Sequence, residues 1–126
     1  TPYTSSAASD VYKRQSGDPS FFLGTDSAPH PTHAKYGKDA KAGIFNAAYG
    51  LEVIAEIFAT ENKLDNLAAF TSVNGAAFYG YEPSQENITL HRSSLDPERA
   101  THISTENGNQ IVLFGVEEAS QWTIST

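Results

Sequence analysis

The clearest pattern along the chain is a helical repeat of apolar residues over positions 43–62. Apolar side chains recur there every three or four residues, a spacing that places them on one face of a helix. The residues of this face are Ile44, Ala48, Leu51, Ala55 and Phe58. A shorter helix is predicted over residues 64–71, and then a last helical turn that ends at Gly80. The pair Asn74-Gly75 also suits a hairpin turn, but its flanks lack the alternation of strands.

Shorter apolar runs predict strands. Residues 21–23, Phe-Phe-Leu, are predicted to form a short buried strand. Residues 88–92 alternate apolar and polar side chains as an edge strand does, and two further strands are predicted at residues 111–114 and 122–124. The Glu-Asn-Gly-Asn sequence at residues 106–109 predicts a turn.

The polar stretch after the first predicted strand holds the candidate chemistry. It reads Gly-Thr-Asp-Ser-Ala-Pro-His over residues 24–30. Gly24 lets the backbone turn, so Asp26 is expected at the carboxyl end of the strand, where barrel enzymes place their catalytic residues. The prolines on either side of His30 exclude a regular helix around it. Taken alone, an Asp at a strand end is more often a turn or cap residue, and His30 is explained equally well as a histidine of a surface loop.

Four motifs in order resemble the dihydroorotase family, the zinc amidohydrolases of pyrimidine synthesis. After the segment at residues 24–30 come Ala42-Gly43 with Phe45-Asn46-Ala47, then Ser72-Val73-Asn74-Gly75, then Phe78-Tyr79-Gly80. One such motif alone is a weak signal, but four at compatible spacing are a strong one. The serine after Asp26, Ser27, resembles the residue that the short, single-function bacterial type carries at this position. Relatives with hydantoinase-like sequences usually carry His there.

The resemblance implies an α/β fold, the C-terminal part of a metal-dependent hydrolase (β/α)8 TIM barrel. The chain would supply the last barrel strand, the helices that follow and a small β tail. Its 126 residues are about half of the ~250 that such a barrel needs. We therefore expect the chain to be a piece of a longer protein. The absence of any Met is consistent with a fragment that lacks the original N-terminus.

The resemblance also implies a reaction, the interconversion of dihydroorotate and N-carbamoyl-L-aspartate in de novo pyrimidine biosynthesis. Two zinc ions per active site would lower the pKa of water and polarise the carbonyl of the cyclic amide. Asp26 matches the family's zinc ligand that acts as general base and then acid. His30 matches a histidine that contacts the substrate carboxylate, and Ala42 matches a backbone contact to the same substrate.

The family's other zinc ligands have no counterpart in this chain. They are a His-x-His pair, a carboxylated Lys and two further histidines, and the Arg and Asn that complete carboxylate recognition are missing too. One aspartate cannot hold two zinc ions. The isolated chain is therefore expected to be inactive, and poorly folded because a single barrel strand has no partners.

The amino-acid composition limits the kinds of partner that the chain can bind. The net charge of −7 argues against binding to nucleic acid or to an anionic membrane, which require basic patches. The chain has no cysteine, which excludes disulfides and thiolate zinc sites and fits a cytoplasmic protein. No apolar run approaches the ~20 residues of a membrane span. The expected partner is a small-molecule substrate, with a homodimer possible for the full-length protein.

Residues 1–15 have no counterpart in the resemblance and are predicted to be a non-native or disordered leader, so that residues 16–126 form the barrel portion with its tail. The run at residues 9–15 is typical of translated adaptor sequence joined to a reading frame. The alternative is a natural disordered tail. Genomic sequence across residue 15 distinguishes the two.

Two other functions remain open. The chain could belong to another cyclic amidohydrolase, of the hydantoinase or allantoinase type, or to a non-catalytic acidic domain in which Asp26 is only a turn residue. A metal site at His30 and His33 is not expected, because Pro31 disrupts the helix that would align the rings.

A run of charged residues follows these histidines and is expected to be exposed to solvent. It comprises Lys35, Lys38, Asp39 and Lys41.

Four further polar residues are predicted to be hydrogen-bonding supports and not reactants, and Trp122 is predicted to pack in the interior. The four supports are Thr25, Ser27, Asn46 and Tyr79.

Overall fold

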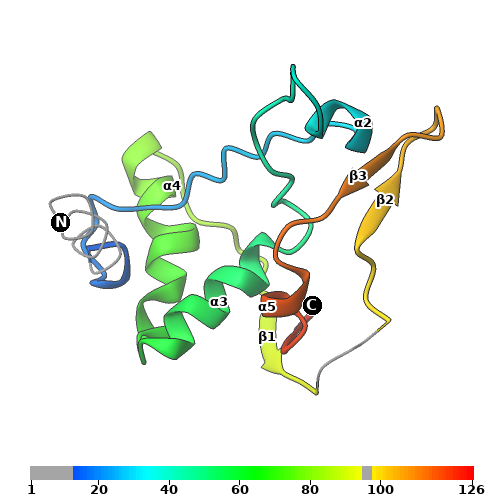
Figure 1. Ribbon diagram of the computed structural model, residues 1–126. Helices are drawn as coiled ribbons and strands as arrows, with labels where there is room; N and C mark the ends of the chain where they lie inside the picture. Colours follow the sequence, from blue (N-terminus) through cyan, green and yellow to red (C-terminus); the bar gives the residue numbers. More distant parts are fainter. Residues whose placement is uncertain (1–12, 95–97) are drawn as a thin grey trace, which may run out of the picture. The chain divides into compact units, whose positions relative to one another are not determined.

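The computed structural model describes residues 13–94 and 98–126 (Figure 1). Most of the predicted leader therefore lies outside the described residues. Its last three residues are helical, and the buried Gln15 side chain donates a hydrogen bond to the Ile57 carbonyl oxygen at 3.3 Å. The origin of the leader stays a prediction.

The described chain divides into two units. The helical unit comprises the residues up to 24, residues 57–88 and residue 126, and the mixed unit comprises residues 25–56 and 89–125. Helix α3 (Gly50–Thr60) contributes to both, because the division falls within it.

Helix α3 is shorter than the helix predicted over residues 43–62. It begins at Gly50, because the backbone before it is engaged with distant segments. The Ile44 carbonyl oxygen accepts a hydrogen bond from the Ala28 N–H at 2.9 Å, and Phe45 forms an isolated parallel bridge within the mixed unit. These long-range bonds replace the bonds to the next turn that a helix requires. Tertiary contacts thus override the apolar period at its start.

In the helical unit, the chain after α3 continues through three short helical segments. They are the 3-10 turn η1 (Leu64–Asn66), the π-helical segment η2 (Ala69–Val73) and α4 (Asn74–Tyr79). Gly80, at φ +76°, ends α4 in the left-handed conformation, as predicted. The second predicted helix is therefore present in irregular form, and the Asn-Gly pair is helical, which confirms that it forms no hairpin.

Residues 21–23 form no strand, which corrects that prediction. The Leu23 N–H donates to the Phe70 carbonyl oxygen at 2.9 Å, and the buried Asn74 amide donates to the Phe21 carbonyl oxygen at 3.1 Å. A strand exists only where a neighbouring strand pairs with it, and no strand of the described residues pairs with this segment. Helical residues hold it in place instead. The rings of Phe58 and Phe70 form the buried apolar contact of this unit, with centroids 5.5 Å apart.

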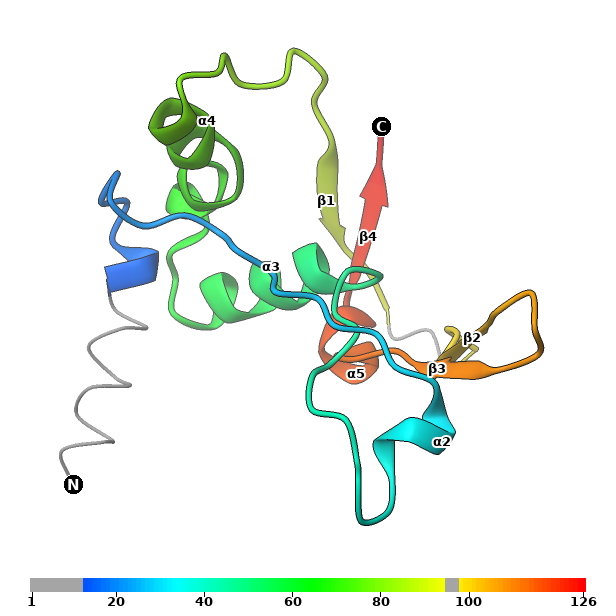
Figure 2. The same cartoon turned by 90° about the horizontal axis from the view of Figure 1, so that it is seen from above.

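In the mixed unit, the described strands form two antiparallel pairs (Figure 2). Strand β1 (Thr89–Arg92) pairs with β4 (Trp122–Ser125), and β2 (His102–Ser104) pairs with β3 (Gln110–Val112). Three of the four confirm predicted strands, and the predicted turn at residues 106–109 joins β2 to β3. Strand β2 was not predicted, because its three residues are exposed and only one of them is apolar.

Two short helices complete the mixed unit. Helix α2 (Thr32–Lys35) begins directly after a proline, and the hydroxyl of Thr32 donates to the Gln110 carbonyl oxygen at 2.9 Å, which ties α2 to β3 (Figure 1). Helix α5 (Val116–Ala119) follows Gly115, which adopts φ +81°. A Cβ at Gly115 would lie 2.4 Å from a methyl group of Val53, so only glycine fits at this close approach.

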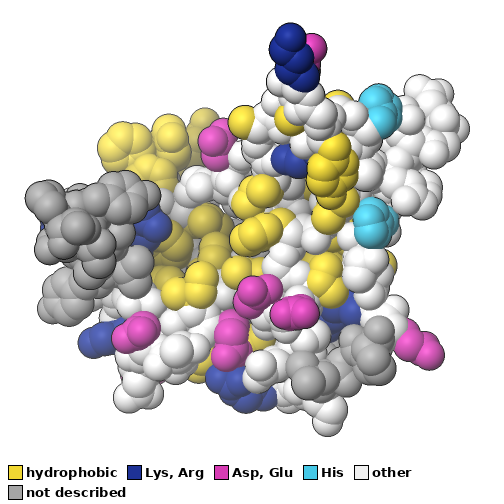
Figure 3. Space-filling view, in the orientation of Figure 1, with side chains coloured by type: hydrophobic (Ala, Val, Ile, Leu, Met, Phe, Trp, Pro, Cys, Tyr) yellow, Lys and Arg dark blue, Asp and Glu magenta, His cyan; other side chains and the backbone are white. Residues whose placement is uncertain are grey.

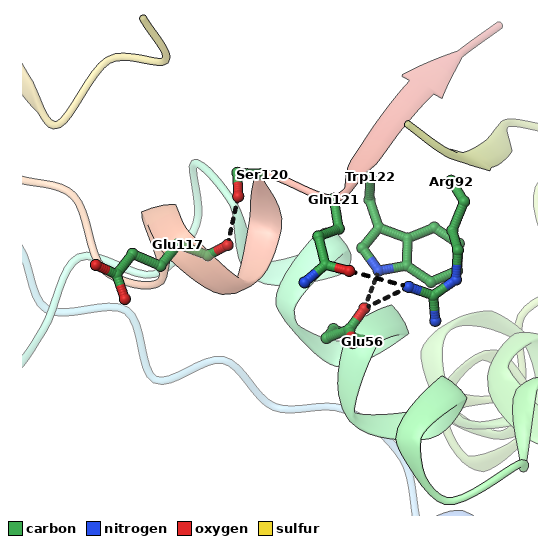
Figure 4. Close-up of polar contacts among 6 residues, drawn as sticks. All are labelled: Glu56, Arg92, Glu117, Ser120, Gln121 and Trp122. Atoms are coloured by element: carbon green, nitrogen blue, oxygen red, sulfur yellow. Dashed lines mark hydrogen bonds and ion pairs between the residues drawn. The ribbon is translucent and has the colours of Figure 1, made fainter. Parts of the chain in front are cut away.

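Trp122 anchors the interior of the mixed unit and is 4% exposed, as its predicted packing role requires. Its indole N–H donates to a carboxylate oxygen of Glu56 at 2.7 Å (Figure 4). The Arg92 guanidinium reaches the same oxygen at 3.3 Å and lies 4.8 Å from the indole centroid. It also donates to the Gln121 side-chain oxygen at 3.2 Å. The half-buried Glu56 charge is therefore balanced by a cation and a buried donor.

Many large hydrophobic side chains remain exposed, and Figure 3 shows such side chains in yellow at the surface. Phe78 is 69% exposed, Tyr79 65% and Ile57 46%. Exposed apolar surface of this kind usually marks a contact with further protein. Within the described residues the strands close no barrel, and the mixture of helix and short strand is that of part of one.

A helix that crosses a bilayer must be both long and apolar. None of the described helices is long enough and apolar enough to span a membrane.

Replacing Trp122 by Phe, in the intact protein that carries this segment, is expected to lower the free energy of unfolding by about 1.5–3 kcal/mol, because a bond from a buried donor to a carboxylate is lost. Replacing Arg92 by Met should cost less than about 1 kcal/mol, since its side chain is 52% exposed and solvent screens the ion pair. Denaturant unfolding measures both, and equal losses would contradict this order.

Candidate functional site

Asp26 lies in an irregular loop segment and not at the end of a strand as predicted, because residues 21–23 form no strand. Its φ is +46°, a left-handed value that aspartate tolerates better than most residues, and its side chain is exposed. The Asn46 side-chain amide donates to the Thr25 carbonyl oxygen at 2.8 Å, which fixes the backbone immediately before Asp26. This bond confirms the supporting role predicted for Asn46, while Thr25 takes part only through its backbone carbonyl.

A second connection joins the same two segments. The hydrogen bond from Ala28 to Ile44 runs beside Gly43, which adopts φ +113°. A Cβ at Gly43 would lie 2.6 Å from the Cβ of Ala28, so the backbones approach as closely as glycine allows. The structure thereby brings the loop of Asp26 and His30 next to the segment that begins at Ala42, which is itself exposed.

His30 is half-buried and lines a pocket of about 190 Å³. Three segments form the pocket: residues 28–35, residues 43–45 and residues 111–115, the last carrying the end of β3 and the turn that follows. Most of its lining is apolar, and His30 and Lys35 are the titratable side chains among the residues that line it. No acidic residue of the described chain lines it.

Two buried polar atoms at the site lack a hydrogen-bond partner among the described residues. They are the Ser27 hydroxyl oxygen and the Asn46 side-chain carbonyl oxygen. A buried polar group without a partner costs about 1–3 kcal/mol. No hydrogen bond among the described residues therefore supports the role predicted for Ser27. Ser27 directly follows Asp26, and Asn46 lies on the neighbouring segment and bonds to Thr25, so a partner supplied by the rest of a longer protein would complete the site there.

The described residues do not form a metal centre by themselves. No group of three His, Asp or Glu side chains is close enough to hold an ion in the described part of the chain. Asp26 contributes a single exposed carboxylate, which is too few ligands for a metal centre. His33 lies exposed on α2 and joins no such group among the described residues.

Two side chains differ from their predicted roles. Tyr79 was predicted to support the site by hydrogen bonding, but its ring packs against Phe22 and Phe78 at centroid distances of 5.9 and 5.0 Å in the helical unit. Lys35 was predicted to be solvated, but it is half-buried and donates to the Gly43 carbonyl oxygen. A lysine within a charged run carries no pattern that would reveal such burial.

Comparison with known proteins gives a consistent family. The chain is 43% identical over 110 residues to a dihydroorotase of Synechococcus sp. strain CC9605, covering 87% of this chain and 30% of that protein. It is 51% identical over 82 residues to one of Ruegeria pomeroyi, covering 65% of this chain and 23% of that protein. A scan against models of protein families finds no match.

Solved structures agree. A dihydroorotase from Saccharomyces cerevisiae in complex with 5-fluoroorotic acid superposes with a TM-score of 0.79 at 30% identity, over 91% of this chain and 32% of that one. A dihydroorotase from Campylobacter jejuni gives a TM-score of 0.68 at 28% identity, over 90% and 31%. The chain thus spans about a third of the length of these relatives.

Sequence and structure together place the chain among the amidohydrolases built on a TIM barrel, as the α/β expectation required. Within that class it belongs to the dihydroorotase family and corresponds to the C-terminal part of those longer proteins.

Replacing Gly43 by Ala in the intact protein is expected to force the two site segments apart, because the new Cβ would meet Ala28. Exchange of the Ala28 amide hydrogen should then accelerate by about tenfold or more, as its bond to Ile44 weakens. Gly37→Ala is the matched control, since Gly37 has φ +103° and a Cβ there would meet no atom within 4 Å. Acceleration in both variants would contradict the close-contact explanation.

Proposed function

We propose that the protein containing this chain is a dihydroorotase, which interconverts N-carbamoyl-L-aspartate and dihydroorotate in de novo pyrimidine biosynthesis. The observation that supports this most is the family membership, combined with the hydrogen bonds that hold the Asp26 loop against residues 42–46. Opening a cyclic amide requires an activated water, a polarised carbonyl and a proton for the leaving nitrogen.

Asp26 is the proposed catalytic residue of this chain. Its carboxylate is exposed on a loop that the Asn46 bond holds, so it can accept a proton from the attacking water and deliver it to the ring nitrogen. It is also the proposed zinc ligand. Two zinc ions, held by Asp26 together with ligands from the rest of the protein, would supply Lewis acidity and acidify the water.

His30 and Ala42 are the proposed substrate-binding residues. The His30 ring lines the pocket and can donate a hydrogen bond to the carboxylate of dihydroorotate. Ala42 contributes through its backbone, which the neighbouring Gly43 contacts hold beside the loop. A cytoplasmic location, a small-molecule substrate as the ligand and a homodimer of the full-length protein complete the proposal.

A substrate panel on the full-length protein tests the reaction. Dihydroorotate and N-carbamoyl-aspartate are expected to be turned over, and hydantoin and allantoin are not, since Ser27 and the block at residues 42–47 favour the dihydroorotase type. Preferential turnover of hydantoin or allantoin would favour the other cyclic amidohydrolases. No turnover of any of these compounds would favour a non-catalytic acidic domain.

Replacing Asp26 by Asn in the full-length protein is expected to lower kcat by at least about 100-fold, because the proton acceptor is lost. Asp39→Asn is the matched control, because Asp39 is exposed on the loop after α2 and should leave kcat unchanged. Metal analysis of both variants should show a loss of zinc only for Asp26→Asn. An unchanged rate in the Asp26 variant would exclude its catalytic role.

The isolated 126-residue chain is expected to show no turnover of dihydroorotate with added zinc, because its described residues supply one ligand and no complete metal centre. Its exposed apolar side chains should also bind a hydrophobic dye such as ANS. Measurable turnover by the chain alone would contradict this expectation.

A further inference from the structure

Lys35 is the side chain of the pocket that the proposed reaction does not yet use. It is the last residue of α2, five positions after His30, and its ammonium group donates a hydrogen bond to the Gly43 carbonyl oxygen. A backbone hydrogen bond also closes the loop between Lys35 and Gly43, because the Lys41 N–H donates to the Ala34 carbonyl oxygen at 2.8 Å.

The bond from Lys35 fixes the peptide that joins Gly43 to Ile44, which directly follows the Ala42–Gly43 peptide. Gly43 is held on its other side by its contact with Ala28 and by the adjacent hydrogen bond from Ala28 to Ile44. The backbone at Gly43 and Ile44, next to Ala42, is therefore clamped between α2 and the loop that carries Asp26 and His30. A change at Lys35 would release one side of this clamp.

The ammonium group also leaves an unbalanced positive charge at the pocket. Lys35 forms no ion pair with a carboxylate of the described residues, and no acidic side chain among them lines the pocket. This is unusual in a chain of net charge −7. A lysine ammonium has three donors, and the Gly43 carbonyl oxygen occupies one, so two remain for a ligand. His30 lines the same pocket, so two side chains that can donate to an anion face one small space.

We propose that Lys35 is a positioning and specificity-determining residue: it holds the backbone at Gly43 and Ile44 in place and selects substrates that carry a carboxylate. The inference rests on the proposed dihydroorotase function and adds to it. Because the effect is on binding of the anionic group, it changes KM and inhibitor affinity and leaves the chemical step unaltered.

The experiment uses the full-length protein with Lys35→Met, Lys35→Arg and the matched control Lys38→Met, in which an exposed lysine three residues later loses the same charge. Lys35→Met is expected to raise KM for dihydroorotate, and the inhibition constant of orotate, about 10- to 100-fold, with kcat within about twofold. Lys35→Arg should retain most of the affinity, and Lys38→Met should match the unsubstituted protein.

Ionic strength supplies a readout that a merely structural role would not move. KM for dihydroorotate should rise with added salt in the unsubstituted protein and depend less on salt in Lys35→Met, because the screened charge is gone. If Lys35→Met does not fold, Lys35→Gln, which retains a donor for Gly43 but no charge, decides the question by the same salt dependence.

The outcomes separate the two proposals. Turnover by the unsubstituted protein together with an unchanged KM in the folded Lys35→Met or Lys35→Gln variant would overturn the role of Lys35 alone. A tenfold fall in kcat at constant KM would also overturn it. Absence of dihydroorotate turnover by the unsubstituted protein would overturn the proposed function, and the role of Lys35 with it.

Discussion

The hydrogen bond from the Ala28 amide to the Ile44 carbonyl is the contact on which the candidate site depends. It joins two segments that are separated along the chain, and it does so where Gly43 has no side chain to keep them apart. One such bond contributes only about 1 kcal/mol net. Its importance is geometric, because the backbones that carry Asp26 and Ala42 take their positions from it. The Asn46 amide adds a second bond of the same kind.

Both units also contain side chains that lack the packing or hydrogen-bond partners they need among the described residues. Phe78 and Ile57 expose much of their apolar surface, and the buried oxygens of Ser27 and Asn46 lack partners among the described residues. The two observations have one explanation, since the chain spans about a third of the relatives that it matches. A barrel buries its strands between helices and a packed interior, so part of a barrel has neither complete.

The sequence predicted the local elements better than their boundaries. The strands of the tail and the helical end at Gly80 could be predicted because alternation and turn residues act locally. The start of α3 could not, since a long-range hydrogen bond at Ile44 competes with the helical period there. Residues 21–23 have the composition of a strand but no partner to pair with in the described chain. Burial of Lys35 depends on Gly43, eight residues away, and no local pattern reports it.

The left-handed backbone at Asp26 has an evolutionary consequence. Asparagine accepts that conformation as readily as aspartate, and its codons differ from those of aspartate by a single base. A point mutation to asparagine would therefore remove the proposed catalytic carboxylate while the loop keeps its shape. A protein with an unchanged loop backbone and no carboxylate at position 26 is thus a single base substitution away.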